Sequence, residues 1–335
     1  MWYITYDNWN GGVAHNFCGL LTSLIISEVF GIEYVHTHMS IALGNAEWLK
    51  HEGANTWEGL VFADFEKFFN FKGGNRDIGD LRKPNRDASI CKNPSFGFIT
   101  LAEIGNCLKG YNRNEDIVFR LTNNNKIWMW TFYDLCNRNV ININLFNKIR
   151  NNLMHNVRFK PVIRRGEVSL HIRKGDCDDD IEWGYSILKN IGKTYKIDRV
   201  NIYAMGTQKQ MREIIDYYSS KKIDNIEYKL NFDTIKSVEG MMGSEILVCS
   251  MHGFFSKTVG YFTDTIKFYG HFLDHGINLT SGGPLFPGYL CGNKPECYDV
   301  RDNELYNFSI NRIKCDIDGN FSNEQFQKSL KHTNE

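Results

Sequence analysis

The chain alternates short apolar runs with longer segments whose apolar residues recur at helical spacing. Residues 2–6 have the composition of a β-strand, and a loop of turn-forming residues follows them. Residues 13–30 then carry apolar side chains at helical spacing and end at Gly31, which is typical of a helix closed by a glycine cap. A second strand is predicted at 32–36. A strand, a glycine-rich turn, a helix and a strand in this order form a βαβ unit, so a parallel sheet is expected.

The second half of the chain repeats this alternation more regularly. Residues 245–250 show no polar alternation, which is typical of a strand buried on both faces of a parallel sheet. The series predicts a Rossmann-like domain. Its predicted strands are 167–172, 199–205, 226–230, 245–250 and 265–269, and its predicted helices are 183–191, 209–218, 235–243 and 254–262.

A linker is predicted between the two halves, because residues 158–166 combine a proline, a glycine and several basic side chains. Within the first half, the polar residues 82–87 are expected to form a loop. A chain of 335 residues suits two domains. We therefore expect an N-terminal Rossmann-like domain over 1–160, a C-terminal Rossmann-like domain over 161–270, and a tail over 271–335 that packs back across the domains.

Composition excludes some classes of function. Apolar residues make up 42% of the chain and charged residues 23%, as in ordinary globular proteins. The 39 basic and 39 acidic residues leave no net charge, which argues against a protein that coats nucleic acid or binds anionic membranes. No apolar stretch is long enough to span a bilayer. A nucleotide remains possible as a small ligand, because one well-placed arginine is enough to bind its phosphates.

The nine cysteines and the histidines show no metal-binding spacing. Because no Cys-x-x-Cys and no signal peptide are present and the number of cysteines is odd, a reducing compartment is expected, and hence a cytoplasmic location. Most cysteines are expected to be small buried residues, with pairing left open for Cys291, Cys297 and Cys315 in the tail. His36 and His38 alternate as in a strand, but no third ligand is nearby, so no metal site is expected.

The sharpest local motif is His-Ile-Arg-Lys-Gly-Asp at 171–176, directly after a strand that is predicted to be buried. Ligands of open α/β sheets bind just past the carboxyl ends of the strands. Arg173 offers a planar fork for phosphate oxygens at that point. Gly175 permits a tight turn, in which Asp176 is placed to orient Arg173. The alternative is a loop whose charges only pair with one another.

This motif, followed by a Rossmann-like domain, resembles the GDP-fucose-dependent fucosyltransferase superfamily, whose α-1,2, α-1,6 and protein O-fucosyltransferase branches share an H-x-R-x-x-D-like motif. Three further stretches resemble family motifs in the same order along the chain, at 10–16, 240–250 and 255–262. The resemblance implies a GT-B fold, an α/β architecture in which two Rossmann-like domains with parallel sheets face an interdomain cleft. It also implies inversion at the anomeric carbon, no bound metal and no cofactor besides the nucleotide-sugar donor.

The resemblance also assigns roles to individual residues. Arg173 would bind the β-phosphate of the donor and stabilise charge on the leaving nucleotide, the work that a metal does in other transferases. A base for the acceptor hydroxyl is expected from His15 or from Asp7, which follows the first strand. The other donor-binding candidates are Gly11, Gly12, Asn16, His171, Asp176, Glu239, Ser250, His252 and Ser256.

Two departures from the family pattern leave the donor open. Where the α-1,6 branch has an Asp that reads guanine, this chain has Ser237, with Glu239 two residues on as a substitute. The loop ends in Ala-His-Asn at 14–16, where the family has Gly-Asn-Gln. We expect transfer of fucose from GDP-fucose to a glycan hydroxyl. A UDP-sugar enzyme such as a xylosyltransferase, or a catalytically inactive glycan-binding relative, is the alternative, and the oligomeric state is open.

Overall fold

The computed structural model describes most of the regular structure that the sequence predicts. The described residues are 1–7, 13–39, 60–81, 86–89, 101–121, 143–174, 181–221, 223–251, 255–270, 311–316 and 318–333. Apart from Leu60 and Val61, those up to Asn156 belong to one compact unit, and those from Val157 onward belong to a second. Each unit is built around its own parallel sheet.

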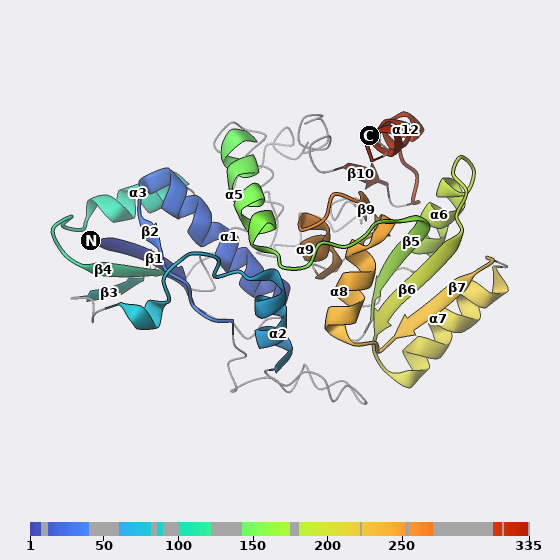
Figure 1. Cartoon of the computed structure of the whole chain (residues 1–335), viewed down its shortest axis with the longest axis horizontal. Coiled ribbons are helices and arrows are strands. Elements are labelled where there is room, and N and C mark those ends of the chain that lie inside the picture. The colour runs from blue at the N-terminus through green and yellow to red at the C-terminus, as the bar shows by residue number, and fades with distance from the viewer. Residues whose placement is uncertain are drawn as a thin grey trace, which may run out of the picture. The chain divides into compact units, whose positions relative to one another are not determined.

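The first sheet has four parallel strands in the order β2-β1-β4-β3 (Figure 1). The chain therefore moves from β1 to β2 on one side and then places β3 and β4 on the other side of β1. The bounds are Trp2–Tyr6 for β1, Glu33–Tyr34 for β2, Arg86–Ser89 for β3 and Ile117–Leu121 for β4.

Helices that bury aromatic side chains pack around this sheet. Helix α1 (Val13–Phe30) packs on β1 and β2 and contacts α5 (Ile143–Asn156), and it ends at Gly31, whose φ of 63° is the left-handed cap expected from the sequence. Helix α2 (Leu60–Phe69) buries Phe65 and Phe69 completely, and Phe69 stacks on Phe71. The remaining described helices of this unit are α3 (Leu101–Lys109) and the short 3-10 turn η2 (Ile78–Asp80).

The second sheet has six parallel strands in the order β10-β9-β8-β5-β6-β7. From β5 the chain moves outward through β6 and β7, and it then crosses to the other side of β5 for β8, β9 and β10. The bounds are Arg164–Arg173 for β5, Arg199–Met205 for β6, Ile226–Leu230 for β7, Ser244–Val248 for β8, Ile266–Gly270 for β9 and Arg312–Cys315 for β10.

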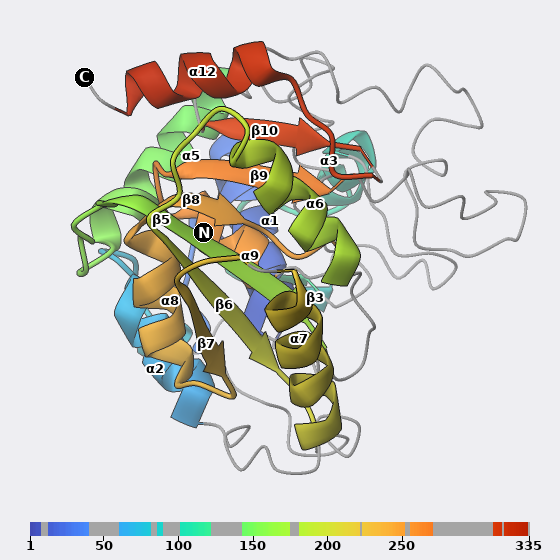
Figure 2. The ribbon, with the colours of Figure 1, turned by 90° about the vertical axis from the view of Figure 1, so that its right-hand side faces the viewer.

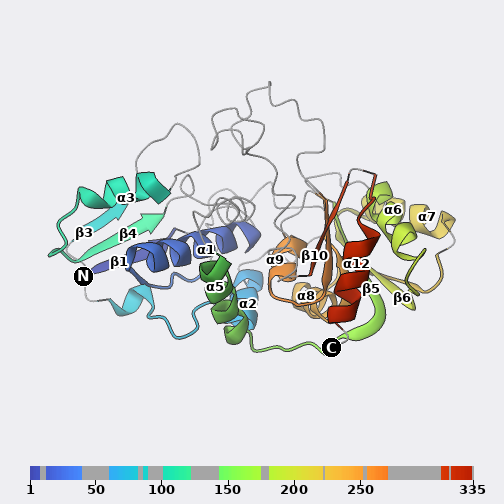
Figure 3. The ribbon, with the colours of Figure 1, turned by 90° about the horizontal axis from the view of Figure 1, so that it is seen from above.

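Helices cover both faces of the second sheet (Figures 2 and 3). On one face α6, α7 and α12 share a core with the strands, in which Trp183, Ile214 and Phe326 are buried. On the other face α8 and α9 contact each other, and α8 packs on β5 and β8. The bounds are Ile181–Ile191 for α6, Gln208–Ser220 for α7, Thr234–Met242 for α8, Phe255–Tyr261 for α9 and Asn323–His332 for α12.

In both sheets, successive strands are added first on one side of a central strand and then on its other side. The reversal lies between β1 and β4 in the first sheet and between β5 and β8 in the second. At such a switch point the connections on the two sides run to opposite faces, which opens a crevice at the carboxyl ends of the two strands, and ligands of α/β proteins bind there. The topology therefore marks one candidate edge in each unit.

The predicted α/β class, with parallel sheets in both halves, is confirmed. The predicted polar loop at 82–87 is partly wrong, because Arg86 and Asp87 begin β3. The described residues beyond 271 form part of the second unit and not a separate tail. Strand β10 extends the second sheet beside β9, and α12 packs on its core (Figure 2).

The described cysteines differ from one another. Cys249 and Cys315 are free and completely buried, so the pairing left open for Cys315 does not occur. Cys107 is disulfide-bonded, which corrects the expectation that such cysteines are only small buried side chains. Among the helices that the structure describes, we find none with the length and apolar character needed to cross a membrane.

Candidate functional site

Arg173 lies at the switch point of the second sheet. It is the last residue of β5, the strand that β6 and β8 flank, and it is half-buried. Because Leu170 pairs with Val248, the residues that follow β8 lie beside the end of β5. The sequence expectation that Arg173 stands at a ligand-binding edge therefore agrees with the topology.

A hydrogen-bonded link joins the three segments that meet at this edge. Ser256 Oγ lies 3.0 Å from His171 Nδ1 and accepts a hydrogen bond of 3.0 Å from the backbone N–H of Ser250. The His171 ring also contacts Phe255, with 5.5 Å between ring centroids. The link thus ties the end of β5 to the turn after β8 and to α9.

Ser250 and Ser256 are nearly or completely buried. The Ser256 hydroxyl, which was expected to hold a donor phosphate, contacts His171 and the backbone of Ser250 inside the unit. These contacts hold His171 against the residues that follow β8.

Two lysines close to this edge are held by partners within the second unit. Lys174 Nζ lies 4.0 Å from Glu213 Oε2 on α7, and its side chain is 6% exposed. Lys257 on α9 donates a 2.9 Å hydrogen bond to the Met251 carbonyl, just past β8. The guanidinium of Arg173, which ends β5, has the planar fork that suits phosphate oxygens.

Glu239, which was expected to read the nucleotide base, lies towards the end of α8. Its carbonyl accepts from Gly243 N–H at the end of α8, and the next carbonyl, that of Gly240, accepts a 3.0 Å bond from Arg164 Nη2. Arg164 begins β5, whereas Arg173 ends it. Helix α8 therefore runs back along the sheet, and Glu239 lies in the half of the helix that is farther from the carboxyl edge.

Asp7 occupies the corresponding edge of the first sheet. Its N–H donates to the Leu121 carbonyl at 2.9 Å, so it lies where β1 and β4 both end. Its carboxylate is 46% exposed and lies 3.5 Å from Arg120 Nη1. An exposed carboxylate beside a cation at a switch point can accept a proton from a ligand hydroxyl.

Asn16, an expected donor-binding residue, is completely buried on α1. The remaining expected residues, Gly11, Gly12, Asp176 and His252, lie outside the described residues, as does the side chain of His15. The structure therefore brings together His171, Arg173, Ser250 and Ser256, and places Asp7 at the equivalent edge of the other sheet.

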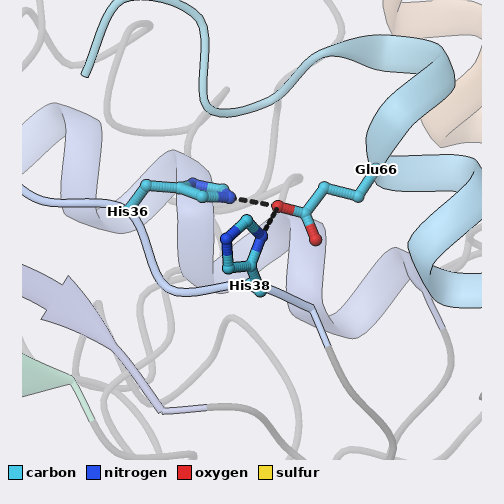
Figure 4. Close-up of side chains that lie close together, drawn as sticks. All are labelled: His36, His38 and Glu66. Atoms are coloured by element: carbon cyan, nitrogen blue, oxygen red, sulfur yellow. Dashed lines mark hydrogen bonds and ion pairs between the residues drawn. The ribbon is translucent and has the colours of Figure 1, made fainter. Parts of the chain in front are cut away.

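The structure also gathers a cluster that sequence reasoning missed (Figure 4). His36 and His38, which follow β2, both contact Glu66 on α2, and the distance from His38 Nδ1 to Glu66 Oε1 is 2.9 Å. The expectation that these histidines have no third ligand nearby is therefore wrong. Burial raises the pKa of the Glu66 carboxyl, but hydrogen bonds from His36, Met39 and His38 outweigh it and hold the pKa below its usual range.

The comparisons with known proteins found similarity only among solved structures. No protein-family model and no curated protein matches the chain. A structure of POFUT1 in complex with GDP has a TM-score of 0.41 and 13% identity, covering 79% of this chain and 95% of that one. POFUT1 with GDP-fucose gives 0.41 and 12%, covering 79% and 94%, and the apo form gives 0.39 and 12%, covering 78% and 95%. POFUT1 is a protein O-fucosyltransferase, but similarity at this level is remote, so the function must be argued from the chain's own residues.

Proposed function

We propose that the chain is a glycosyltransferase and that the carboxyl edge between β5 and β8 binds the diphosphate of its nucleotide-sugar donor. The observation that carries the proposal is the position of Arg173 at the switch point of the second sheet, beside the turn that Ser256 ties to His171. The same arginine lies in the motif that resembles the fucosyltransferase superfamily. Topology and motif thus select the same residue independently.

Arg173 has a defined chemical task in this reaction. As the acceptor oxygen attacks the anomeric carbon, the bond to the diphosphate breaks and negative charge grows on the leaving nucleotide. A guanidinium that binds the phosphate oxygens stabilises this charge most strongly in the transition state. Lys174 and Lys257 raise the local positive potential. In this proposal these cations serve the diphosphate in place of a metal ion.

The acceptor is a glycan hydroxyl in this proposal, and Asp7 and His15 are the candidate bases for its proton. Asp7 is the candidate that the described residues support, because its exposed carboxylate lies at the switch point. His15 remains the alternative base. Attack from the face opposite the diphosphate inverts the anomeric carbon in a single displacement, and the rate depends on positioning the two reactants.

GDP-fucose is the donor that the resemblance favours. Glu239 is the candidate for reading guanine, but it lies towards the end of α8 that is farther from Arg173, so UDP-sugars stay the alternative donors. A cytoplasmic location remains part of the proposal, but the disulfide at Cys107 counts against it, because disulfides are rare in the cytosol.

Arg173→Ala, compared with Arg199→Ala, tests the proposal. Arg199 begins β6 at the opposite edge of the same sheet and is 56% exposed, so its replacement controls for loss of charge. We expect Arg173→Ala to lower transfer by at least about 100-fold, since it removes a group that stabilises the transition state. Arg199→Ala should stay near wild type. Near-normal transfer by Arg173→Ala would show that the diphosphate lies elsewhere.

Thermal unfolding with GDP, UDP and their sugars identifies the donor class. A ligand present at 100 times its dissociation constant stabilises the native state by about 2.7 kcal/mol. Stabilisation by guanine nucleotides alone supports GDP-fucose, and stabilisation by uridine nucleotides alone supports the alternative donor. An inactive glycan-binding relative would respond to neither.

A further inference from the structure

The cluster of His36, His38 and Glu66 lies beyond the end of β2, on the carboxyl side of the first sheet (Figure 4). One ligand atom from each side chain lies within 4.8 Å of the other two. We propose that these three residues bind one divalent transition-metal ion, and that Zn²⁺ fits the ligand set best. This site is separate from Arg173 and does not depend on the proposed transfer reaction.

The ligand types select the class of ion. Two imidazole nitrogens and one carboxylate oxygen form a set that binds Zn²⁺ through three protein ligands and leaves a fourth position open. Mg²⁺ and Ca²⁺ prefer sites made of oxygen ligands, so a site in which two of three ligands are imidazoles disfavours them. The set therefore indicates a first-row transition ion of the zinc type.

The backbone holds the ligands in place without a metal. His36 N–H donates to the Arg76 carbonyl at 2.8 Å, and its own carbonyl accepts from Ile78 N–H at 2.9 Å. The Oε2 atom of Glu66 accepts a 2.8 Å bond from Met39 N–H. The other oxygen, Oε1, faces both imidazoles. The buried Phe65 and Phe69 hold α2, so an ion would meet a preformed site.

The outer nitrogens of both imidazoles also have partners. His36 faces Glu66 through Nε2, and its Nδ1 lies 2.9 Å from the hydroxyl of Tyr34. His38 faces Glu66 through Nδ1, and its Nε2 lies within ion-pair distance of Asp77 Oδ1, at 3.2 Å, without the geometry of a hydrogen bond. Metal-binding histidines have an acceptor on their second nitrogen, because it fixes the ring and its tautomer, and the Tyr34 hydroxyl is placed to be that acceptor for His36. This second layer distinguishes the cluster from two histidines that merely touch a carboxylate.

An ion can reach the site from the side of His38. The side chain of His38 is 68% exposed, whereas that of His36 is fully buried. Tetrahedral Zn²⁺ with bonds of about 2.0–2.1 Å holds its ligand atoms roughly 3.3 Å apart. The contacts of Glu66 Oε1 with both imidazoles therefore have to lengthen when an ion binds, the shorter contact with His36 by more than the 2.9 Å contact with His38.

Calorimetric titration of the full, untagged chain with Zn²⁺, after treatment with a chelator, tests the proposal. We expect the wild type to bind one ion per chain with high affinity. His38→Gln removes one ligand at an exposed position and should weaken binding by at least about tenfold, and Glu66→Gln should do the same. Asp77→Asn changes only the second layer and should weaken binding by about 10–100-fold. The matched control is His155→Gln, at an exposed position on α5, which should bind as the wild type does.

Unfolding temperatures measured in the presence of chelator show whether each variant folds as stably as the wild type when no metal is bound. His38→Gln should melt with the wild type under these conditions, and when Zn²⁺ is added it should gain clearly less stability than the wild type and His155→Gln. The gain should be about 5 °C at 100 times the dissociation constant. A wild type that binds no stoichiometric ion, or that binds one which His38→Gln and Glu66→Gln retain at unchanged affinity, would overturn the proposal.

Discussion

At the residue scale, buried polar groups hold together the segments around Arg173 at the carboxyl edge of the second sheet. Ser256 is completely buried, and its hydroxyl contacts both His171 and the backbone of Ser250. One small side chain therefore fixes the end of a strand against the turn that faces it. Loss of the Ser256 hydroxyl should therefore destabilise the fold and change the local conformation at this edge, while the Arg173 side chain stays present.

Ser256→Ala should lower the free energy of unfolding by about 1 kcal/mol, because it removes the hydrogen bonds of one buried hydroxyl. Ser220→Ala is the matched control, since Ser220 is exposed and bonds only to the Tyr217 carbonyl within its own helix. Denaturation by urea measures both variants. Equal stabilities of Ser256→Ala and Ser220→Ala would refute the positioning role of Ser256.

Cys249 gives a residue-scale prediction about pH. Burial raises the pKa of its thiol from 9.0 to about 12. The neutral thiol is therefore favoured in the folded state, and the stability that it contributes is complete below pH 9. This contribution should be lost as the pH rises from 9 towards 12, because only the unfolded thiol ionises readily there.

Maleimide labelling of the native chain measures this directly. Cys249 should stay unlabelled at pH 8 until denaturant is added, since the thiolate is the reactive form and the thiol is buried. Cys249→Ser should flatten the decline in stability above pH 9. Rapid labelling of native Cys249 would contradict the burial on which the prediction rests.

At the element scale, β5 owes its position to a bulge near its start. Its pairing with β8 shifts register between Arg164 and Val168, and Gly166 lies in that shift with a φ of 73°. The Gly166 N–H donates to Glu245 Oε2 at 2.8 Å, so the bulge is anchored to β8. The strand that ends at Arg173 therefore begins at a point where glycine is required.

Gly166→Ala should destabilise the protein by about 1–2 kcal/mol, because the left-handed backbone conformation that glycine adopts freely is unfavourable for alanine. Its Cβ would also lie 2.4 Å from Asp198 Oδ2, so Asp198 would have to move. Gly192→Ala serves as the control, since its Cβ meets its nearest atom at 3.4 Å. Chemical denaturation should separate the two variants, and equal stabilities would contradict the role of the bulge.

The same scale shows which elements the sequence pattern predicts and which it misses. β1, α1, β6 and β7 match their predicted ranges, because each is a long or strongly apolar segment with clear turn residues at its ends. β3 was missed because its sequence, Arg-Asp-Ala-Ser, has little strand propensity and pairs only through tertiary contact with β4. β10, with the sequence Arg-Ile-Lys-Cys, was not predicted, and it gains its strand character by pairing with β9.

At the scale of the whole chain, the strand order of each sheet reverses at one point, and Arg173 and Asp7 lie at the ends of strands beside those two points. The motif around Arg173 was predictable because it is contiguous in sequence. The cluster of His36, His38 and Glu66 was not, because about thirty residues separate Glu66 from the histidines and no local spacing reveals their contact. The position of Glu239 in the fold was not predictable either. A residue's place in a sequence motif does not show how far its helix carries it along the sheet.

A crystal structure of the chain with bound GDP, or with UDP if only uridine nucleotides stabilise it, tests the central claim most directly. The proposal predicts the diphosphate at the carboxyl ends of β5 and β8, with phosphate oxygens about 2.7–2.9 Å from the Arg173 guanidinium. The link between His171, Ser256 and Ser250 should remain intact. A nucleotide bound at another place in the chain, or no binding of either nucleotide, would contradict it.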